Sequence, residues 1–345
     1  MKAALVVVEP GLHTTLQDLG RTGYQNVGVP VSGALDQDSL RLANALVGNA
    51  ADMAALEIRY VGPVLEVAAD SVRVALAGTS SAIELIADGE STTVPAGRGV
   101  TVPRGARIRV PALIGSATAY LAVEGGFDVR AVLGSRSTYV RGALGGHNGG
   151  ILAAGDRLDL NRDAVSAGPD QAVREPSDLR PPKRVRVVLG PQETHFTADS
   201  IATFLSAEWT ISTEADRMGA RLDGPTLTHK NGHNIVSDGI VTGAIQVPGS
   251  GQPILLLADR QTTGGYPKIG AVISADLPAL GRMRPGDHVR FAAVSVADAV
   301  AIRRRHDQRL DEIIGAIGPA VADGGFDLEA LYRENLVSGV VGPYE

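Results

Sequence analysis

The fold is decided by the stretch Pro253-Ile254-Leu255-Leu256-Leu257-Ala258-Asp259-Arg260-Gln261-Thr262-Thr263-Gly264-Gly265-Tyr266-Pro267. Its apolar run from Ile254 to Ala258 predicts a strand that is buried on both faces. The run leads directly into a polar loop with paired glycines, which tolerate positive φ and let a ligand approach the backbone. A plain turn between two strands fits the same residues equally well. The stretch therefore predicts a buried strand that ends either in a binding loop or in a structural turn.

The composition indicates a globular protein that is rich in strands. The chain has 345 residues, of which 44% are hydrophobic and 4% aromatic, with 42 glycines. This length predicts about two domains. Short apolar runs about ten residues apart are typical of a β-barrel or a β-sandwich. These runs are residues 64–68, 72–77, 82–87, 99–102, 107–110 and 118–123.

Charge and cysteine content exclude several classes of function. A net charge of −6 argues against a nucleic-acid partner, which requires clustered Lys and Arg. A chain without cysteine has no disulfide, no thiolate nucleophile and no Cys-type zinc site. His229 and His233 are four residues apart, but Lys230-Asn231-Gly232 between them predicts a hairpin rather than a metal site. With no signal-peptide pattern and no apolar stretch of about 20 residues, we expect a cytoplasmic protein without a membrane partner.

The organisation along the chain suggests two β units. Residues 162–184 are rich in proline and polar residues, which predicts a linker. We therefore expect one β unit in residues 1–161, a second in residues 185–294 and a helical tail in residues 295–345. Two pairs of short segments hint at a duplication of one β unit, with chance similarity as the alternative. The pairs are 59–65 with 221–227, and 83–88 with 254–259.

Four helices are expected among the strands. The helix in residues 36–47 has Asp36 as its N-cap and Gly48 as its stop signal. In the tail, Ser295 and Asp298 form a pair that resembles a capping box. The other three helices are residues 197–205, 295–315 and about 327–336.

Several familiar catalytic motifs are absent, whereas polar clusters recur. The chain has no P-loop, no Gly-x-Gly-x-x-Gly fingerprint and no Gly-x-Ser-x-Gly elbow. An Asp beside an Arg either pins a turn or helps to bind a carboxylate. Asp, Gln and Thr side chains together suit a ligand that both donates and accepts hydrogen bonds, such as an amide, lactam or ureido group. The clusters are residues 17–21, 32–36, 216–219 and 237–238 with 246–248.

The order of these clusters resembles one known family. Six segments resemble signatures of the biotin-dependent-carboxyltransferase-like family, and the resemblance covers about residues 4–300. This family includes the C subunit of 5-oxoprolinase, proteins labelled allophanate hydrolase subunit 2, an antagonist of a sporulation-kinase inhibitor, and half of the carboxyltransferase domain of urea carboxylase. The segments are residues 10–21, 28–36, 43–49, 216–219, 243–248 and 261–267.

The resemblance implies a mainly β fold with a few helices, made of two related cyclophilin-like β-barrel units. It also implies a partner of the subunit-B or subunit-1 type and a composite site. Two departures matter. The chain has no Ala-Met-Lys-Met motif, so biotin would not be attached to it and could act only in trans. It also lacks the Ser-Ser-Lys amidase signature, so the allophanate hydrolase label would not describe its own chemistry.

Three functional hypotheses follow from the resemblance. The first is a hydrolase subunit of an ATP-dependent 5-oxoprolinase, active only in complex with a subunit-B-type protein and a subunit-A-type hydrolase. ATP would be bound by the complex, because this chain has no P-loop. The second is a carboxyltransferase component that acts on urea or a similar amide. The third is a non-enzymatic protein that binds and antagonises a kinase inhibitor.

Twelve residues of the polar clusters are the candidates for the site, and none of them is expected to bind a metal. Arg217 is expected to hold a carboxylate or a developing oxyanion. The expected catalytic residues are Asp216, Arg217, Gln261, Thr262 and Thr263. The expected substrate-binding residues are Gln246, Ser237, Asp259, Asp18, Arg21, Asp36 and Asn44.

Overall fold

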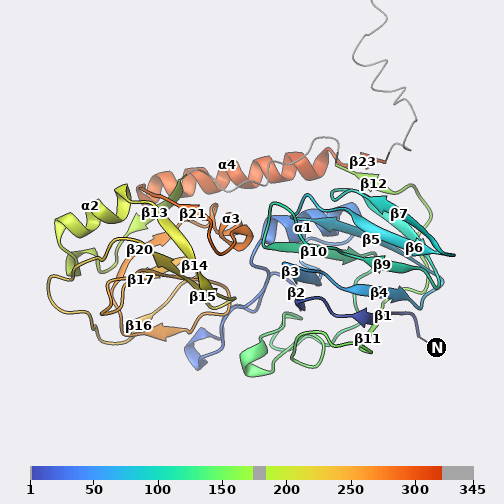
Figure 1. The fold of residues 1–345 in the computed structure, drawn as a ribbon, viewed down its shortest axis with the longest axis horizontal. Coiled ribbons are helices and arrows are strands. Elements are labelled where there is room, and N and C mark those ends of the chain that lie inside the picture. The colour runs from blue at the N-terminus through green and yellow to red at the C-terminus, as the bar shows by residue number, and fades with distance from the viewer. Residues whose placement is uncertain (1, 174–183, 321–345) are drawn as a thin grey trace, which may run out of the picture.

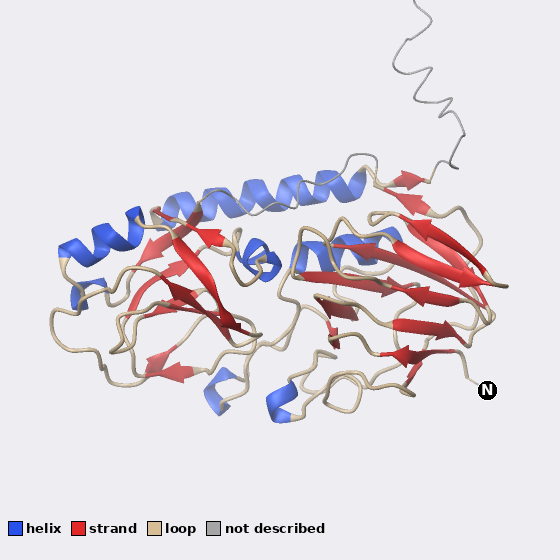
Figure 2. Ribbon diagram, viewed as in Figure 1, coloured by secondary structure: helices blue, strands red, loops and turns tan. Residues whose placement is uncertain are grey.

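A computed structural model describes residues 2–173 and 184–320. Strands form most of the regular structure in these residues, which confirms the expectation of a mainly β fold with a few helices (Figure 2). The strands fall into two groups that lie side by side, and one long helix runs above both (Figure 1). No helix in residues 2–173 and 184–320 is long and apolar enough to traverse a bilayer.

The first group consists of two antiparallel sheets. One has the strand order β11-β1-β4-β9-β6-β7 and the other β2-β3-β10-β5-β8. Apolar side chains such as Leu5, Leu56, Leu65 and Leu121 fill the core between them. The strands are β1 (Ala4–Glu9), β2 (His13–Gln17), β3 (Ala55–Arg59), β4 (Val64–Val67), β5 (Ser71–Ala77), β6 (Ile83–Ala87), β7 (Glu90–Val94), β8 (Gly99–Pro103), β9 (Arg107–Arg109), β10 (Thr118–Val123) and β11 (Arg157–Asp159).

Helix α1 (Gln37–Leu46) packs on the outer face of the five-stranded sheet. Asp36 accepts a hydrogen bond from the backbone N–H of Ser39, and Gly48 has φ 72°, so both predicted end signals are confirmed. Leu40 and Leu46 of α1 pack against Tyr120 of β10. Every residue of β10 is buried because the core covers one face and α1 covers the other.

The second group is one eight-stranded sheet that nearly closes into a barrel. Its order is β21-β14-β15-β18-β17-β20-β13-β22, and only Arg290 separates the two edge strands β21 and β22 along the chain. Trp209, Ile245 and Phe291 are fully buried in its core. The strands are β13 (Val185–Leu189), β14 (Trp209–Ala215), β15 (Gly219–Asp223), β17 (Ala244–Gln246), β18 (Ile254–Leu256), β20 (Lys268–Val272), β21 (His288–Val289) and β22 (Phe291–Ala293).

The strand expected at residues 254–258 is shorter than its apolar run. β18 ends at Leu256, although Leu257 and Ala258 are also buried. The backbone N–H of Leu257 donates to Met218 O, and that of Asp259 donates to Arg217 O. The apolar run is continuous because the buried turn that follows the strand packs under the β14–β15 connection.

The segments that suggested a duplication pair differently in the two groups. The first copies lie at the end of β3, at the start of β4 and on β6. β4 and β6 share the six-stranded sheet, where β9 separates them. β15 and β18, which carry the second copies, are direct neighbours. The duplication therefore stays a prediction, as do the domain boundaries.

The other helices show what local signals can predict. Helices α2 (Ala198–Ser206) and α4 (Val296–Gly315) form where they were expected, with Thr197 and Ser295 as their N-caps. Helix α3 (Leu277–Arg282) was not predicted, because it has only six residues and contains Pro278 and Gly281. The helix expected near 327–336 lies outside the described residues.

Part of the predicted linker is anchored to the first group. Strand β12 (Gln171–Ala172) pairs with β23 (Gly318–Pro319), which follows α4. The buried Arg73 of β5 donates to Asp170 at 2.9 Å and to the carbonyl of Gly168 at 2.9 Å. The first residues of the linker therefore lie against the β5 side of the five-stranded sheet.

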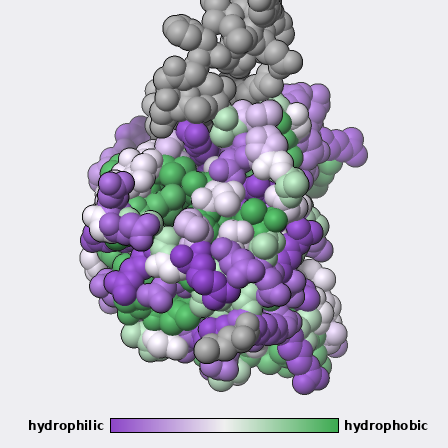
Figure 3. Space-filling model, turned by 90° about the vertical axis from the view of Figure 1, so that its right-hand side faces the viewer, coloured by the Kyte–Doolittle hydropathy of each residue, from purple (hydrophilic) through white to green (hydrophobic). Residues whose placement is uncertain are grey.

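The end of the first group that faces away from the second has a mixed surface. Hydrophobic areas on this face are interspersed with hydrophilic ones (Figure 3). Exposed ion pairs such as Arg107–Glu66 and Arg109–Glu84 lie on strands of the six-stranded sheet.

Helix α4 ties the two groups together. Its Arg303 donates to the carbonyl of Ser274 at 3.2 Å, in the second group. At α1 of the first group, His306 Nε2 lies 2.8 Å from an Asp38 oxygen, and Asp311 lies 3.2 Å from Arg41 Nη2. The helix therefore acts as a brace across the junction.

The contact between His306 and Asp38 is expected to make this brace sensitive to pH. The hydrogen bond that the His306 imidazolium donates to Asp38 raises the pKa of His306 above its ordinary value, although burial opposes the shift. A raised folded-state pKa stabilises the fold fully below about pH 6.5, and this stabilisation is lost as pH rises through the folded-state value. We expect His306→Gln to lower the free energy of unfolding more at about pH 5.5 than at about pH 8.5.

Urea denaturation at both pH values measures this difference. His288→Gln is the control, because the His288 imidazole is 60% exposed and 3.7 Å from Glu208. An equal loss from His306→Gln at both pH values would show that His306 braces the junction by packing alone.

Candidate functional site

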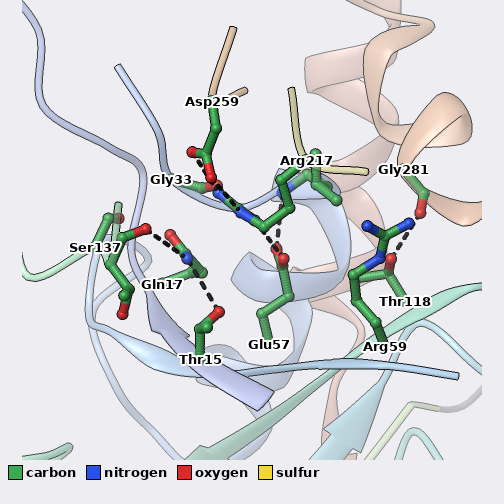
Figure 4. A network of polar contacts seen from close by, with 12 residues as sticks. Thr15, Gln17, Gly33, Glu57, Arg59, Thr118, Ser137, Arg217, Asp259 and Gly281 are labelled. Atoms are coloured by element: carbon green, nitrogen blue, oxygen red, sulfur yellow. Dashed lines mark hydrogen bonds and ion pairs between the residues drawn. The ribbon is translucent and has the colours of Figure 1, made fainter. Parts of the chain in front are cut away.

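A buried ionic network joins the two groups of strands. Arg217 lies in the turn between β14 and β15, and its guanidinium points toward the first group (Figure 4). Its Nε and Nη2 donate to the carboxylate of Asp259 at 2.8 and 3.1 Å, and Nη2 also donates to Gly33 O at 2.7 Å. Nη1 donates to Glu57 of β3. Arg217 is only 4% exposed, so this network is closed to solvent.

The electrostatics of the network keep Arg217 charged. Burial alone would lower the pKa of Arg217, but the carboxylates of Asp259 and Glu57 outweigh it and raise the pKa above its ordinary value. Glu57 also accepts hydrogen bonds from the Tyr120 hydroxyl at 2.6 Å and from the backbone N–H of Leu35 at 2.9 Å. Each charge is paired and hydrogen-bonded, as buried ions must be.

A second buried pair lies nearby. Arg282 of α3 donates to both oxygens of Asp36, at 2.6 and 3.1 Å. Burial opposes the charge of Arg282, but the Asp36 carboxylate outweighs it and raises the pKa of Arg282. Asp36 thus caps α1 and also fastens α3 of the second group to the first.

Six of the candidate residues lie in buried contacts within the fold. Arg217, Asp259 and Asp36 were expected to touch the substrate, but their polar atoms are used within the junction. Asn44, Asp18 and Arg21 are likewise buried and bonded to the fold. Asn44 donates to Met53 O at 2.7 Å, Asp18 accepts from Ser135 at 2.6 Å, and Arg21 donates to Ser137 O. These six side chains shape the structure rather than an open surface.

An open groove lies on the other side of the β14–β15 connection. It has a volume of about 460 Å³ and combines apolar side chains with amides and charges of both signs. This size and mixture suit a small organic ligand. Its lining residues are Arg141, Thr213, Glu214, Ala215, Asp216, Met218, Gly219, Arg221, Gln246, Ile254, Leu256, Gln261 and Tyr266.

Two amide side chains line the groove, of which Gln246 is buried and Gln261 is exposed. Gln246 of β17 is 2% exposed, and its Nε2 donates to Tyr266 O at 3.3 Å. Gln261 Nε2 lies 3.4 Å from Gln246 Oε1. Each side chain carries both a donor and an acceptor, so together they can match the N–H and C=O of an amide.

The remaining candidates lie beside the groove. Asp216 lines it, with Oδ1 accepting from the backbone N–H groups of Met218 and Gly219. Thr262, Thr263 and Ser237 belong to the short ribbon of β16 (Asp238–Gly239) and β19 (Thr263–Gly264) and the residues next to it, and they are not among the lining residues. The structure thus brings together three of the expected residues: Asp216, Gln246 and Gln261.

Tyr266 and Arg141 are among the groove residues that the sequence-based prediction missed. Tyr266 lies in the loop of residues 261–267 but was not among the predicted site residues. Arg141 lies in the short 3-10 helix η2 (Val140–Gly142), about 75 residues before Asp216, and no local pattern pointed to it. In the described part of the chain, no cluster of three side chains is suited to hold a metal ion.

The chain matches a known family along most of its length. The family described as carboxyltransferase domain, subdomain A and B, matches residues 27–293. The chain belongs to this family. This confirms the resemblance drawn from the six sequence segments.

The chain is similar to curated proteins of two kinds. The chain is 34% identical over 309 residues to the C subunit of 5-oxoprolinase from Escherichia coli, covering 90% of this chain and 97% of the relative. It is 37% identical over 310 residues to the C subunit of 5-oxoprolinase from Haemophilus influenzae, covering 87% and 94%. The urea amidolyase of Saccharomyces cerevisiae is 31% identical over 335 residues, but this chain spans only 18% of it.

Solved structures show the same fold of the carboxyltransferase domain. The urea carboxylase of Kluyveromyces lactis matches with a TM-score of 0.82 and 32% identity, over 94% of this chain and 30% of that one. The K. lactis urea amidolyase matches with a TM-score of 0.83 and 31% identity, over 91% and 20%. In these larger proteins the region similar to this chain is a fraction of the whole.

Proposed function

We propose that this chain is the C subunit of an ATP-dependent 5-oxoprolinase, which opens the lactam of 5-oxoproline to give glutamate. The observation that carries the proposal is the match to two 5-oxoprolinase C subunits over 97% and 94% of their lengths. The urea amidolyases, in contrast, are much longer than this chain. The match to the C subunits therefore covers nearly their whole length, whereas the match to the urea amidolyases covers 18% of theirs.

The groove offers chemistry that suits a lactam. The amides of Gln246 and Gln261 can pair with the ring N–H and C=O, and Ile254, Leu256 and Met218 provide apolar contacts for the ring carbons. Thr262, Thr263 and Ser237 on the adjacent ribbon would reach the ligand only after the loop moves. We assign substrate orientation to the two glutamines.

The reaction needs partner subunits. The sequence has no P-loop, so ATP would be bound by a subunit-B-type partner or a subunit-A-type hydrolase. The groove is open, and polar groups on loops gain catalytic power when water is excluded and their geometry is fixed. A docked partner would provide both conditions, so we expect the isolated chain to release no glutamate.

Co-expression with a subunit-B-type protein tests this proposal. We expect sizing with light scattering to show a hetero-oligomer that gains ATP-dependent glutamate release when a subunit-A-type hydrolase is added. A chain that stays alone and hydrolyses 5-oxoproline unaided would contradict the need for a partner. A hetero-oligomer that turns over no substrate would instead support the binding-protein hypothesis.

A second candidate is a carboxyltransferase that acts on urea or a similar amide, with carboxybiotin supplied in trans. It is favoured by the urea carboxylase of K. lactis, whose structure matches 94% of this chain. The same complex distinguishes the two. Stimulation of carboxybiotin turnover by urea, but not by 5-oxoproline, would support the carboxyltransferase.

A further inference from the structure

Arg141 belongs to the first group of strands but lines the groove, which is formed mainly by the second group. It lines the groove together with Gln246 and Gln261, although it lies between β10 and β11 along the chain. Its Nη2 lies 3.2 Å from Asp216 Oδ2, and the side chains of Arg141 and Asp216 are 61% and 55% exposed. The groove is thus lined by an exposed cation together with one buried and one exposed amide.

The Asp216 carboxylate is held in place by backbone hydrogen bonds, whereas its ion pair with Arg141 contributes little free energy. Asp216 Oδ1 accepts from Met218 N at 2.7 Å and from Gly219 N at 3.2 Å, so the turn holds the carboxylate in place. A single contact between two half-exposed groups contributes little to stability. A guanidinium has five N–H donors and prefers a bidentate carboxylate, and one contact uses few of them. Arg141 therefore has capacity for a second anion.

We infer that Arg141 is the carboxylate receptor of the groove and that Asp216 holds its place until substrate arrives. The ligand class is a small lactam that carries a carboxylate, with the lactam on the glutamines and the carboxylate on Arg141. Binding exchanges the Asp216 contact for a bidentate one, and no covalent bond changes. This inference rests on the proposed function and adds the basis of its specificity, because urea and other neutral amides would not engage Arg141.

The other cation of the groove is less suited to this role. Arg221 Nε lies 2.8 Å from Glu214, and both residues belong to the β14–β15 hairpin. This pair is formed within one hairpin, and the Glu214 side chain is 70% exposed. Asp216, by contrast, is held by the turn and cannot follow Arg141 when a ligand draws it inward.

Calorimetry with 5-oxoproline and the reconstituted complex tests the inference whether or not glutamate is released. We expect Arg141→Gln to weaken 5-oxoproline binding about ten- to hundredfold, as for a lost hydrogen-bonded charge. The matched control is Arg104→Gln, because Arg104 pairs with Asp70 at 2.7 Å with exposures of 60% and 70%, remote from the groove. We expect Arg104→Gln to bind 5-oxoproline as the unaltered complex does.

Two further measurements separate recognition from a structural role. Binding of the neutral lactam 2-pyrrolidinone should be equal in Arg141→Gln and the unaltered complex. Asp216→Asn keeps an oxygen for the turn but removes the competing charge, so it should bind 5-oxoproline at least as tightly, with Asp70→Asn as its control. If the complex releases glutamate, the KM for 5-oxoproline should change in each variant in proportion to its affinity. The kcat of each variant should stay within about twofold of the value for the unaltered complex.

Several results would overturn the inference. Unchanged 5-oxoproline affinity in Arg141→Gln, equal losses for 5-oxoproline and 2-pyrrolidinone, or a loss in Arg221→Gln alone would each remove Arg141 from this role. A complex that releases glutamate with unchanged KM in Arg141→Gln would leave the proposed function intact and refute only the receptor. A complex that binds no 5-oxoproline would refute both.

Discussion

Replacing Arg217 by methionine should lower the free energy of unfolding of this chain by about 3–5 kcal/mol, because it leaves two buried carboxylates without a counter-charge. Glu57 is fully buried and Asp259 is 5% exposed, and both lose the guanidinium that neutralises them. Glu57 belongs to the first group of strands, so the loss also loosens the junction. Urea denaturation of the isolated chain measures the effect.

The sequence alone predicts that Arg217 belongs to the substrate site. An arginine that contacts only the substrate could be replaced with little change in the free energy of unfolding. The control is Arg221→Met on the same hairpin, whose side chain is 52% exposed and which should change the free energy of unfolding by about 0.5 kcal/mol or less. An equally small effect of Arg217→Met, with loss of complex activity, would return Arg217 to the substrate site.

Replacing Asp36 by alanine should also cost about 3–5 kcal/mol, because it removes the carboxylate that neutralises the buried Arg282. The change removes the N-cap of α1 as well, since Asp36 accepts from the backbone N–H of Ser39. The matched control is Thr197→Ala, which removes the N-cap of α2 without breaking an ion pair and should cost about 1 kcal/mol.

The difference between these two capping variants isolates the buried pair. It is measured by urea denaturation under the same conditions. If Asp36→Ala lowered the free energy of unfolding no more than Thr197→Ala, the contact between Arg282 and Asp36 would not stabilise the junction. The junction would then be held together by α4 and the Arg217 network.

Local signals in the sequence were sufficient for the elements that obey local rules. Asp36, Thr197 and Ser295 cap helices as their positions predict, because an N-cap depends on a few neighbouring residues. The same signals could not predict α3, whose Pro278 and Gly281 are poor helix formers and which is held by contacts to the first group.

The candidate site was predictable only in part, because ion-pair partners are set by the fold. Arg217 bonds to Glu57, which lies 160 residues earlier in the chain, and no pattern around either residue reveals this. Polar residues at the ends of regular elements were interpreted as binding groups. Gln246 and Gln261 line the groove, so for them this interpretation stays a prediction. Asp36 and Asp259 lie in buried ion pairs with arginines, which no local pattern indicated.

The most direct test of the proposed function is an add-back titration. A subunit-B-type protein and a subunit-A-type hydrolase are held at fixed concentration with ATP and 5-oxoproline, and this chain is added in increasing amounts. We expect no glutamate release without the chain, then a rate that rises and reaches a plateau once the partners are saturated. Glutamate release at the full rate without this chain would contradict its role as a 5-oxoprolinase subunit.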